Sequence, residues 1–458
     1  MVTAFEHLAT EMATADLGDA RLSRRLGLIM AALSRRPGES LPKTLVSAAA
    51  LEATYRFMSN QSVTPQRILA PHIAATCVRA EEAGFALAIQ DTTECEFAGE
   101  SRQGLGRLSE RRRGFHAHVC LAATVDDGRP LGILGAHTWA RPDEVPGRKK
   151  RATYAHRTRE AKESDRWIAV AERVEAMTRT RARVIHVMDR EADFYKLEAR
   201  LVDLGAEFVI RGSHLERKLA DGRRLEDATS DVRVRLEREV VVSKRLTTRD
   251  KAHPKRVKRM ATLAAGATTI RVKRSWAVRA KDGPEFDLNV VHVWEPTPPA
   301  GQSAVEWTLL TTLPTTTAKE IAFVIDVYRR RWLIEELFKA LKTGCQLQKL
   351  QLETGAALVN AFAVMLPVAV RLLALRNVAR TSPEARASDV LTALQIKILA
   401  VHEHTRALPL VTARDAMLAV ARLGGHITNN GDPGWLVLGR GHEDLLALEA
   451  GASLALEM

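Results

Sequence analysis

Cysteine is scarce in this sequence of 458 residues, which contains four, with no two of them close together. They are Cys77, Cys95, Cys120 and Cys345. Small secreted domains depend on dense disulfides, and cysteine-based zinc sites need closely spaced ligands. The composition therefore argues against both and favours free thiols in a reducing compartment. We expect a cytoplasmic protein.

Long hydrophobic segments are also lacking. The stretch from Met1 to Asp19 has no basic region followed by an apolar core, so we expect no signal peptide. The longest apolar run, Ala356 to Val370, contains Asn360 and Pro367, and we expect it to be too short to cross a bilayer. No internal repeat or low-complexity tract is found. The length of 458 residues allows two or three domains, and these absences predict a soluble protein with no membrane partner.

Positive charge, by contrast, is in excess, with a formal net charge of +13. This balance favours a polyanionic partner, and nucleic acid before a membrane. Near the N-terminus, an amphipathic stretch directs Leu22, Leu26 and Ile29 to one side and arginines to the other. A small basic helical domain usually binds DNA or a protein partner, although a solvated surface has the same pattern. The arginines are Arg21, Arg24, Arg25, Arg35 and Arg36.

The order of the periodic segments predicts a mixed sheet flanked by helices, a fold of the α/β (mixed α+β) class. Residues up to about 65 indicate short helices, and helical sequence resumes after Leu372. Short apolar segments end at Asp91, Asp189 and Arg211. An Asp-Gly turn between the first two predicts a β-hairpin. The region between Arg211 and Trp307 alternates with period two and predicts an antiparallel β insertion. Two basic stretches, 141–159 and 247–259, are interpreted as loops.

The stretch from Ala318 to Thr343 predicts one long helix. Thr317 and Glu320 form a capping box before it, and Gly344 would end it in a left-handed conformation. At about 100° per residue, one face carries a single acid in a row of bases and an aromatic hydroxyl. This pattern indicates a metal-holding carboxylate among phosphate-binding cations, or a solvated face of i,i+4 ion pairs. The side chains are Tyr328, Arg331, Glu335, Lys339 and Lys342.

Three carboxylates could form a metal site. Asp91 and Asp189 come where apolar strands end, and strand ends share an edge of a sheet where ligands commonly bind; Glu335 lies on the following helix. Such a set suits Mg²⁺, and two such ions can assist an in-line phosphoryl displacement. We therefore predict two Mg²⁺ ions, with Mn²⁺ as a substitute. Each acid alone is also a common cap or turn former, and Asp193 fits such a structural role.

These residues carry a resemblance to bacterial cut-and-paste DDE transposases of insertion-sequence group four, the Tn-five type. The family motif Y-(2)-R-(3)-E-(6)-K is matched without a gap by Tyr328, Arg331, Glu335 and Lys342. The DTT at Asp91, the DREAD segment at 189–193 and the FVIR segment ending at Arg211 also match. So do EWTLLT around Trp307, ARLGG near the C-terminus and LGDAR near the N-terminus, so the resemblance covers essentially the whole chain.

The resemblance implies an RNase H-like catalytic domain at residues 67–372, with the β insertion at about 212–306. A helical DNA-binding domain would occupy residues 1–66 and a helical dimerisation region residues 373–458. The implied partners are double-stranded DNA, as terminal inverted repeats and as target, and a second copy of the chain in the synaptic complex. The protein would act in the bacterial cytoplasm, associated with the nucleoid when bound to DNA.

The resemblance also implies residue roles. Asp91, Asp189 and Glu335 would be catalytic metal ligands. Tyr328 and the basic residues of the helix would contact phosphates of the transposon end. Arg211 and Trp307 would contact a flipped base while the hairpin forms. Trp332 matches an active-site aromatic of the family. One departure is Ser213, where the family pattern has a lysine, so a phosphate contact is in doubt there. The basic loop at 148–151 is assigned only DNA backbone affinity.

The implied reaction starts with attack of a metal-activated water on the transposon end. The released 3′-OH attacks the opposite strand to form a hairpin, which water opens, and the 3′-OH then attacks target DNA. No covalent enzyme intermediate is needed, and the position of Tyr328 beside Glu335 favours phosphate binding over a nucleophilic role. Two alternatives remain: a nuclease of the same fold without strand transfer, and a non-catalytic DNA-binding relative of a transposase.

Overall fold

The computed structural model describes most of the chain, which forms two compact units. The first unit comprises residues 1–86, 91–160 and 332–458, and the second comprises 87–90 and 161–331. Strand β1 (Phe85–Glu96) contributes to both, because its middle residues belong to the second unit. The described residues are 8–35, 40–45, 47–99, 102–141, 163–242, 257–274, 285–427 and 431–457.

The first unit begins with short helices, as predicted. They are α1 (Leu8–Ala13), α2 (Ala20–Arg35), α3 (Leu41–Thr44), α4 (Ala48–Met58) and α5 (Pro65–Ala83). Helix α2 buries Leu26 and Ile29 and exposes Arg21 and Arg24, which confirms the predicted amphipathic face for these residues, whereas Leu22 is only half-buried. Helix α1 is joined to α5 through Glu11, whose carboxylate lies 2.6 Å from Nδ1 of the buried His72.

The strands of the first unit include residues 91–96 of β1, together with β2 (Gly106–Arg107), β3 (Arg113–Thr124) and β4 (Pro130–Trp139). Strands β3 and β4 pair antiparallel, which confirms the predicted hairpin. The position predicted for Asp91 at a strand end is wrong, because β1 continues to Glu96. Beyond Asp91 the strand alternates, burying Thr93 and Cys95 and leaving their neighbours partly exposed, so one face still packs although the residues are polar.

The C-terminal part of the first unit is helical. It contains α11 (Trp332–Lys339), α12 (Gly355–Thr381), α13 (Ala393–Val401), α14 (Ala413–Leu423) and α15 (Trp435–Glu457). Helix α12 has 27 residues, and by length and composition it could cross a membrane, so the argument that this run is too short is wrong. It is a core helix instead, because 94% of its apolar window is buried within the protein. The predicted domain boundary at residue 372 lies inside it.

The second unit contains residues 87–90 of β1. Next to β1 in the sheet lies β5, and the order of strands then continues with β6, β10, β9, β8 and β7. Strands β5 and β6 are parallel, and the pairs from β6 to β7 are antiparallel, so the predicted antiparallel insertion is confirmed and extends the same sheet. The bounds are β5 (Arg183–Met188), β6 (Glu207–Arg211), β7 (Leu236–Val242), β8 (Arg259–Val272), β9 (Phe286–Trp294) and β10 (Glu306–Thr311).

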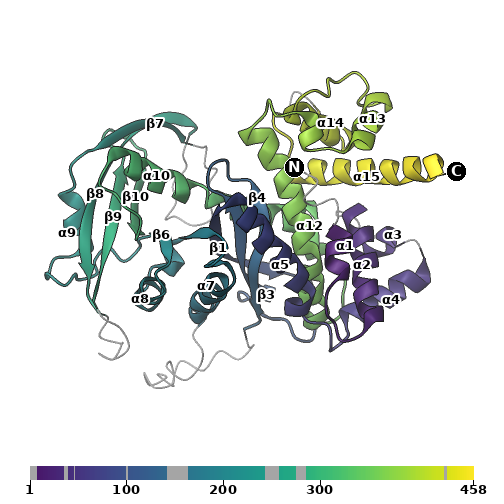
Figure 1. Cartoon of the computed structure of the whole chain (residues 1–458), viewed down its shortest axis with the longest axis horizontal. Coiled ribbons are helices and arrows are strands. Elements are labelled where there is room, and N and C mark those ends of the chain that lie inside the picture. Colours follow the sequence, from purple (N-terminus) through teal and green to yellow (C-terminus); the bar gives the residue numbers. More distant parts are fainter. Residues whose placement is uncertain are drawn as a thin grey trace. The chain divides into compact units, whose positions relative to one another are not determined.

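Among the described residues of this unit, the α-helices that accompany the sheet are α7 (Asp165–Thr178), α8 (Tyr195–Asp203), α9 (Leu225–Ser230) and α10 (Ala318–Arg329). In Figure 1, α7 and α8 lie below β6 and α10 lies above it. The lower face forms a core in which Trp167 and Leu201 pack with Phe208 and Ile210 of β6. Because side chains alternate along a strand, the intervening Val209 faces the other side. The sheet is therefore covered on both faces near β6.

The predicted single helix from Ala318 to Thr343 is wrong. The capping box of Thr317 and Glu320 is present, but α10 ends at Arg329, α11 begins at Trp332, and residues Ala340–Gly344 are a π-helix. The amide of Arg331 bonds to the carbonyl of Tyr328, three residues back, which is tighter than an α-helical turn. A constant rotation of about 100° per residue, from which one shared helix face was predicted, therefore does not apply along this stretch. Gly344 is not left-handed either; the left-handed residue is Gln346, with φ of 50°.

Candidate active site

Asp91 lies in the middle of β1 and is half-buried. Its Oδ1 accepts a hydrogen bond of 2.7 Å from the amide of Thr92, and the hydroxyl of Thr92 lies 3.0 Å from Nδ1 of the buried His118 on β3. The alternation of β1 fixes the side of the strand on which each of these side chains lies. Asp91 is thus held on a rigid strand instead of a loop.

Glu335 is in the first turn of α11 and is half-buried, whereas the adjacent Glu336 is buried. Glu336 is paired with Lys339 at 2.7 Å and with Arg376 of α12 at 2.8 Å. Although burial disfavours its charged form, these cations hold the pKa of Glu336 below its usual value. Glu336 therefore anchors helix α11 to α12. Lys339, whose ammonium group was predicted to contact DNA, pairs with the same carboxylate.

Lys342 and Trp332 differ in exposure. Burial lowers the pKa of Lys342, partly opposed by Cys95 and Glu94 of β1, so its ammonium group lies near that strand. Trp332 is 53% exposed, and Nζ of Lys339 lies 4.7 Å from the centre of its ring. A large exposed indole beside a cation can stack on a nucleic-acid base. Of these two residues, Trp332 is the exposed one, whereas Lys342 is partly buried against β1.

In the second unit, Asp189 directly follows β5 and is half-buried, as predicted. Its Oδ1 accepts a hydrogen bond of 2.9 Å from the amide of Glu191 and caps the short helix η2 (Arg190–Ala192). Strand β5 is itself held by the buried His186, whose Nδ1 lies 3.1 Å from the side-chain amide nitrogen of Gln90 and whose Nε2 lies 2.9 Å from the carboxylate of Glu175. The hydrogen bond to Glu191 thus holds the turn at Asp189, and the contacts of His186 hold the strand that precedes it.

The second unit also contains four residues that were predicted to contact DNA. Trp307 on β10 is half-buried, and its ring lies 5.9 Å from that of Tyr328 in an edge-on arrangement. Tyr328 is buried at the end of α10, and Arg331 follows in the turn. Arg211 ends β6 and donates a hydrogen bond of 3.3 Å to the carbonyl of Glu306. Arg211, Trp307 and Tyr328 therefore belong to one unit, whereas Lys342 belongs to the other.

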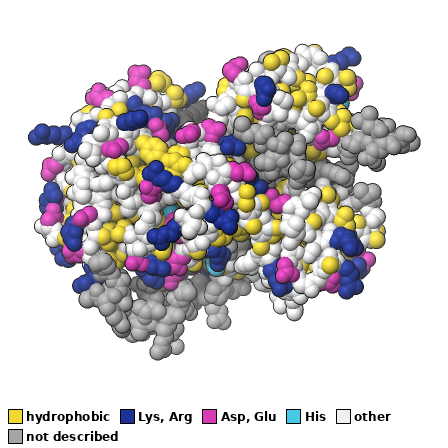
Figure 2. Space-filling model, in the orientation of Figure 1, with side chains coloured by type: hydrophobic (Ala, Val, Ile, Leu, Met, Phe, Trp, Pro, Cys, Tyr) yellow, Lys and Arg dark blue, Asp and Glu magenta, His cyan; other side chains and the backbone are white. Residues whose placement is uncertain are grey.

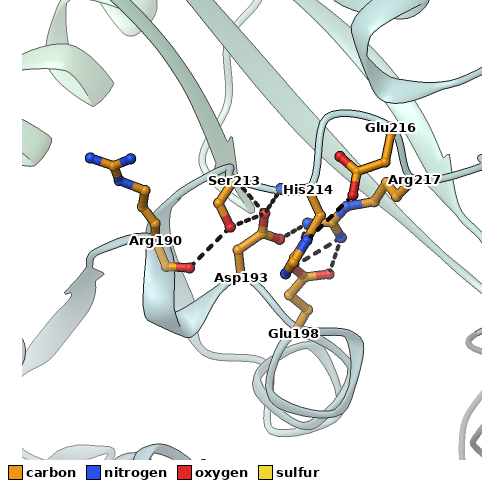
Figure 3. Close-up of polar contacts among 7 residues, drawn as sticks. All are labelled: Arg190, Asp193, Glu198, Ser213, His214, Glu216 and Arg217. Atoms are coloured by element: carbon orange, nitrogen blue, oxygen red, sulfur yellow. Dashed lines mark hydrogen bonds and ion pairs between the residues drawn. The ribbon is translucent and has the colours of Figure 1, made fainter. Parts of the chain in front are cut away.

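Asp193, the second acid of the DREAD segment, has a structural environment. Figure 3 shows its carboxylate directed towards Ser213, His214 and Arg217, with the side chain of Arg190 pointing away. Its Oδ2 accepts hydrogen bonds from the amides of Ser213 and His214 and from the Ser213 hydroxyl, and Oδ1 is ion-paired with Arg217. The sequence alone could not identify these partners, because they lie 20 or more residues away.

The chemistry of the predicted metal ligands suits Mg²⁺, because all three are half-buried carboxylates on regular elements or directly after one. Asp91 and Glu335 belong to the first unit and Asp189 to the second. Within either unit, the described residues contain no cluster of three His, Cys, Asp or Glu side chains that could hold a metal ion. The four cysteines are free and buried, as expected, so they are not part of a disulfide.

Basic side chains are distributed widely. Figure 2 shows Lys and Arg scattered among acidic side chains on the visible face, where they do not gather in a single patch. In α2, Arg24 is exposed, while Arg21 is ion-paired with Asp19 at 3.1 Å. The basic loop at 148–151 lies outside the described residues, as do the side chains of Arg35 and Arg36. Among the described elements, α2 is thus a candidate DNA contact.

Two family models match the chain. Residues 5–63 match a transposase DNA-binding domain, and residues 150–369 match a transposase DDE domain. The first range contains α1 to α4, and the second contains Asp189, Glu335 and the YREK residues, while Asp91 lies outside both ranges. A DDE domain implies an RNase H-like core, which agrees with the mixed sheet and its helices. The chain therefore combines a transposase DNA-binding domain with a transposase DDE domain, and the pair supports a DNA transposase.

Proposed function

We propose that this protein carries out cut-and-paste transposition, by cleaving transposon ends, forming hairpins and transferring the 3′ ends to target DNA. The observation that carries the proposal is the combination, on one chain, of the two transposase domains with an ungapped YREK motif. Because the motif resembles that of insertion-sequence group four, membership of this group is part of the proposal. Because this reaction requires access to DNA, the proposal includes action in the bacterial cytoplasm, in association with the nucleoid.

In this proposal, Asp91, Asp189 and Glu335 hold the divalent metal ions. When bound, two Mg²⁺ ions, or Mn²⁺ in their place, would activate the attacking oxygen and stabilise the leaving oxygen. The protein side chains orient these ligands: the capped turn holds Asp189, and the anchored helix α11 holds Glu335. No protein nucleophile is required for this reaction.

The DNA contacts follow from the remaining groups. Arg331, Lys342 and Tyr328 would bind phosphates of the transposon end, while the partly exposed Trp307 would stack on a flipped base beside Arg211. Lys339 would contribute less than predicted, because its ammonium group is already paired with Glu336. A homodimer, with the C-terminal helices as its interface, would hold two transposon ends in one synaptic complex.

The proposal can be tested with a labelled duplex that carries the inverted repeat bracketing the reading frame. In Mg²⁺, we expect nicking, a hairpin intermediate, and joining of a pre-cut 3′-OH end to a target plasmid. Nicking with neither a hairpin nor a joined product would instead identify a nuclease. Sequence-specific binding without any cleavage, in Mg²⁺ or Mn²⁺, would identify a non-catalytic DNA-binding protein. Asp189→Ala serves as the control for metal-dependent chemistry.

A further inference from the structure

The buried carboxylate of Asp193 joins two segments that each carry a residue of the proposed site. Asp193 ends the turn that starts at Asp189. The Ser213 hydroxyl, which donates to this carboxylate, also lies 3.1 Å from the carbonyl of Arg190. Two contacts thus hold the loop after Arg211 directly against the turn after Asp189. Figure 3 shows the turn and the loop facing each other through these groups.

The same loop is also held on its other side, by β10. The amide of Gly212 donates a hydrogen bond of 2.8 Å to the carbonyl of Thr308, and Arg211 donates to the carbonyl of Glu306. A Cβ atom at Gly212 would lie 3.3 Å from the Thr308 side chain, so the approach is close. These contacts lie on either side of Trp307. A continuous set of contacts therefore runs from Asp189 through Asp193 to Trp307.

Arg217 is the cation of this network. It is ion-paired with Asp193 and also lies 2.9 Å from the carboxyl group of Glu198 of α8, and both acidic side chains have no exposed surface. A buried ion pair is costly to form, and removing one partner leaves an uncompensated charge. Such a network contributes little net stability, but it strongly favours one geometry of the groups that it joins. Little net stability together with one favoured geometry is expected of a network that positions the groups it joins.

We propose that Asp193 and Arg217 are positioning residues, which keep the turn of Asp189 in register with the loop of Arg211 and with Trp307. The inference rests on the proposed function, because it assigns these three residues to the reaction. It also assigns a role to Ser213. In this chain, the residue at that position fastens the loop to the turn, because its amide and hydroxyl groups both contact Asp193. Loss of the network should therefore affect metal binding and base flipping together.

The test compares Asp193→Asn with Asp221→Asn, in an exposed aspartate that is paired with Arg223 in the same unit. Three properties of the full-length protein are measured on terminal-repeat DNA. The first is the nicking rate at saturating DNA. The second is Mn²⁺ affinity, from the electron paramagnetic resonance signal of free Mn²⁺ titrated into the protein–DNA complex. The third is the fluorescence of 2-aminopurine at the flipped position of a pre-nicked end, which reports unstacking.

For Asp193→Asn we expect unchanged DNA affinity, a loss of roughly 10–100-fold in nicking and in Mn²⁺ affinity, and reduced 2-aminopurine fluorescence. Asp221→Asn should match the wild type. If Asp193→Asn does not fold, Ser213→Ala decides the question, because it removes only the hydroxyl contacts and should show a smaller loss of the same three signals. Wild-type values for a folded variant would overturn the inference. Absence of cleavage by the wild type would instead overturn the proposed function.

Discussion

Glu336 lies 2.8 Å from Arg376, with both side chains nearly buried, whereas the side chain of its neighbour Glu335 is half-buried. Two adjacent acids of identical type therefore have different environments. Arg376 also packs its guanidinium over the ring of Trp435, 4.3 Å from the ring centre. Glu336 thus connects α11 to α12 and, through Arg376, to α15. It is a structural anchor, while Glu335 remains the candidate metal ligand.

The first prediction separates these two acids. Glu335→Ala should bind the terminal repeat with wild-type affinity but cleave nothing in Mg²⁺ or Mn²⁺, because a metal ligand is lost while the basic groups remain. Glu336→Ala should instead lower the free energy of unfolding by about 3–5 kcal/mol, since it leaves Arg376 buried without its partner. Gel shift, strand cleavage and urea denaturation measure these effects.

The matched control for both variants is Glu353→Ala, which removes an exposed acid of the same unit. It should change neither cleavage nor stability. Cleavage by Glu335→Ala at the wild-type rate would show that this carboxylate does not bind metal.

The second prediction concerns Trp307. Stacking of an indole on an unpaired base contributes about 1–3 kcal/mol, and Trp307 is only half-buried, which argues against a purely core role. Trp307→Ala should nick the first strand normally but form little hairpin, whereas Trp307→Phe should retain part of the activity. Trp294→Ala, in a half-buried tryptophan of the neighbouring strand, is the control and should form hairpins. Equal defects in both alanine variants would mean that the loss comes from packing.

The third prediction concerns the N-terminal helices. Deleting residues 1–65 would remove Glu11, the partner of His72, and the carbonyls of Met58 and Val63 that bind Asn360 of α12. Such a deletion would disturb folding, so substitutions in α2 are the better test. The double variant Arg21→Ala and Arg24→Ala should bind the terminal repeat more weakly.

The salt dependence of this binding identifies the cause. Each lost phosphate contact should reduce the slope of log affinity against log salt by about 0.9. Arg406→Ala, in an exposed arginine of the C-terminal region, should leave the slope unchanged. A footprint and a slope equal to those of the wild type in the double variant would remove α2 from the DNA interface.

The fourth prediction is a pH dependence of stability. Burial raises the pKa of Glu198 from its ordinary value near 4.5 to about 8. The folded state therefore holds this proton more tightly than the unfolded state. Stability from this group is fully present below about pH 4.5 and is lost as the pH rises to about 8, at about 1.4 kcal/mol per unit of pKa difference.

Glu198→Gln should remove this loss. The midpoint of urea denaturation of the second unit should fall less between pH 5 and pH 8.5 in the variant than in the wild type. Glu226→Gln, in an exposed acid paired with Arg224, should behave like the wild type. Parallel pH profiles for Glu198→Gln and wild type would show that Glu198 does not titrate in this range.

Local patterns predicted many elements of the fold. The capping box at Thr317, the hairpin of β3 and β4, the strand before Asp189 and the antiparallel insertion all depend on neighbouring residues or on period-two alternation, which are visible in the sequence. Three expectations failed because they depend on distant contacts. Neither the length of β1 beyond Asp91, nor the break near Arg331, nor the continuation of α12 from Val370 to Thr381 is marked by glycine or proline at the relevant position.

By itself, the sequence determined the residue types and spacings from which a DDE transposase was expected, together with the basic amphipathic face of α2. Tertiary structure alone decided which of two adjacent glutamates is an anchor, and which partners Asp193 and Ser213 have. The physical reason is that burial and pairing of a charged group depend on segments far away in the chain. Arg376 lies 40 residues from Glu336, and His214 lies 21 residues from Asp193. No local periodicity encodes those distances.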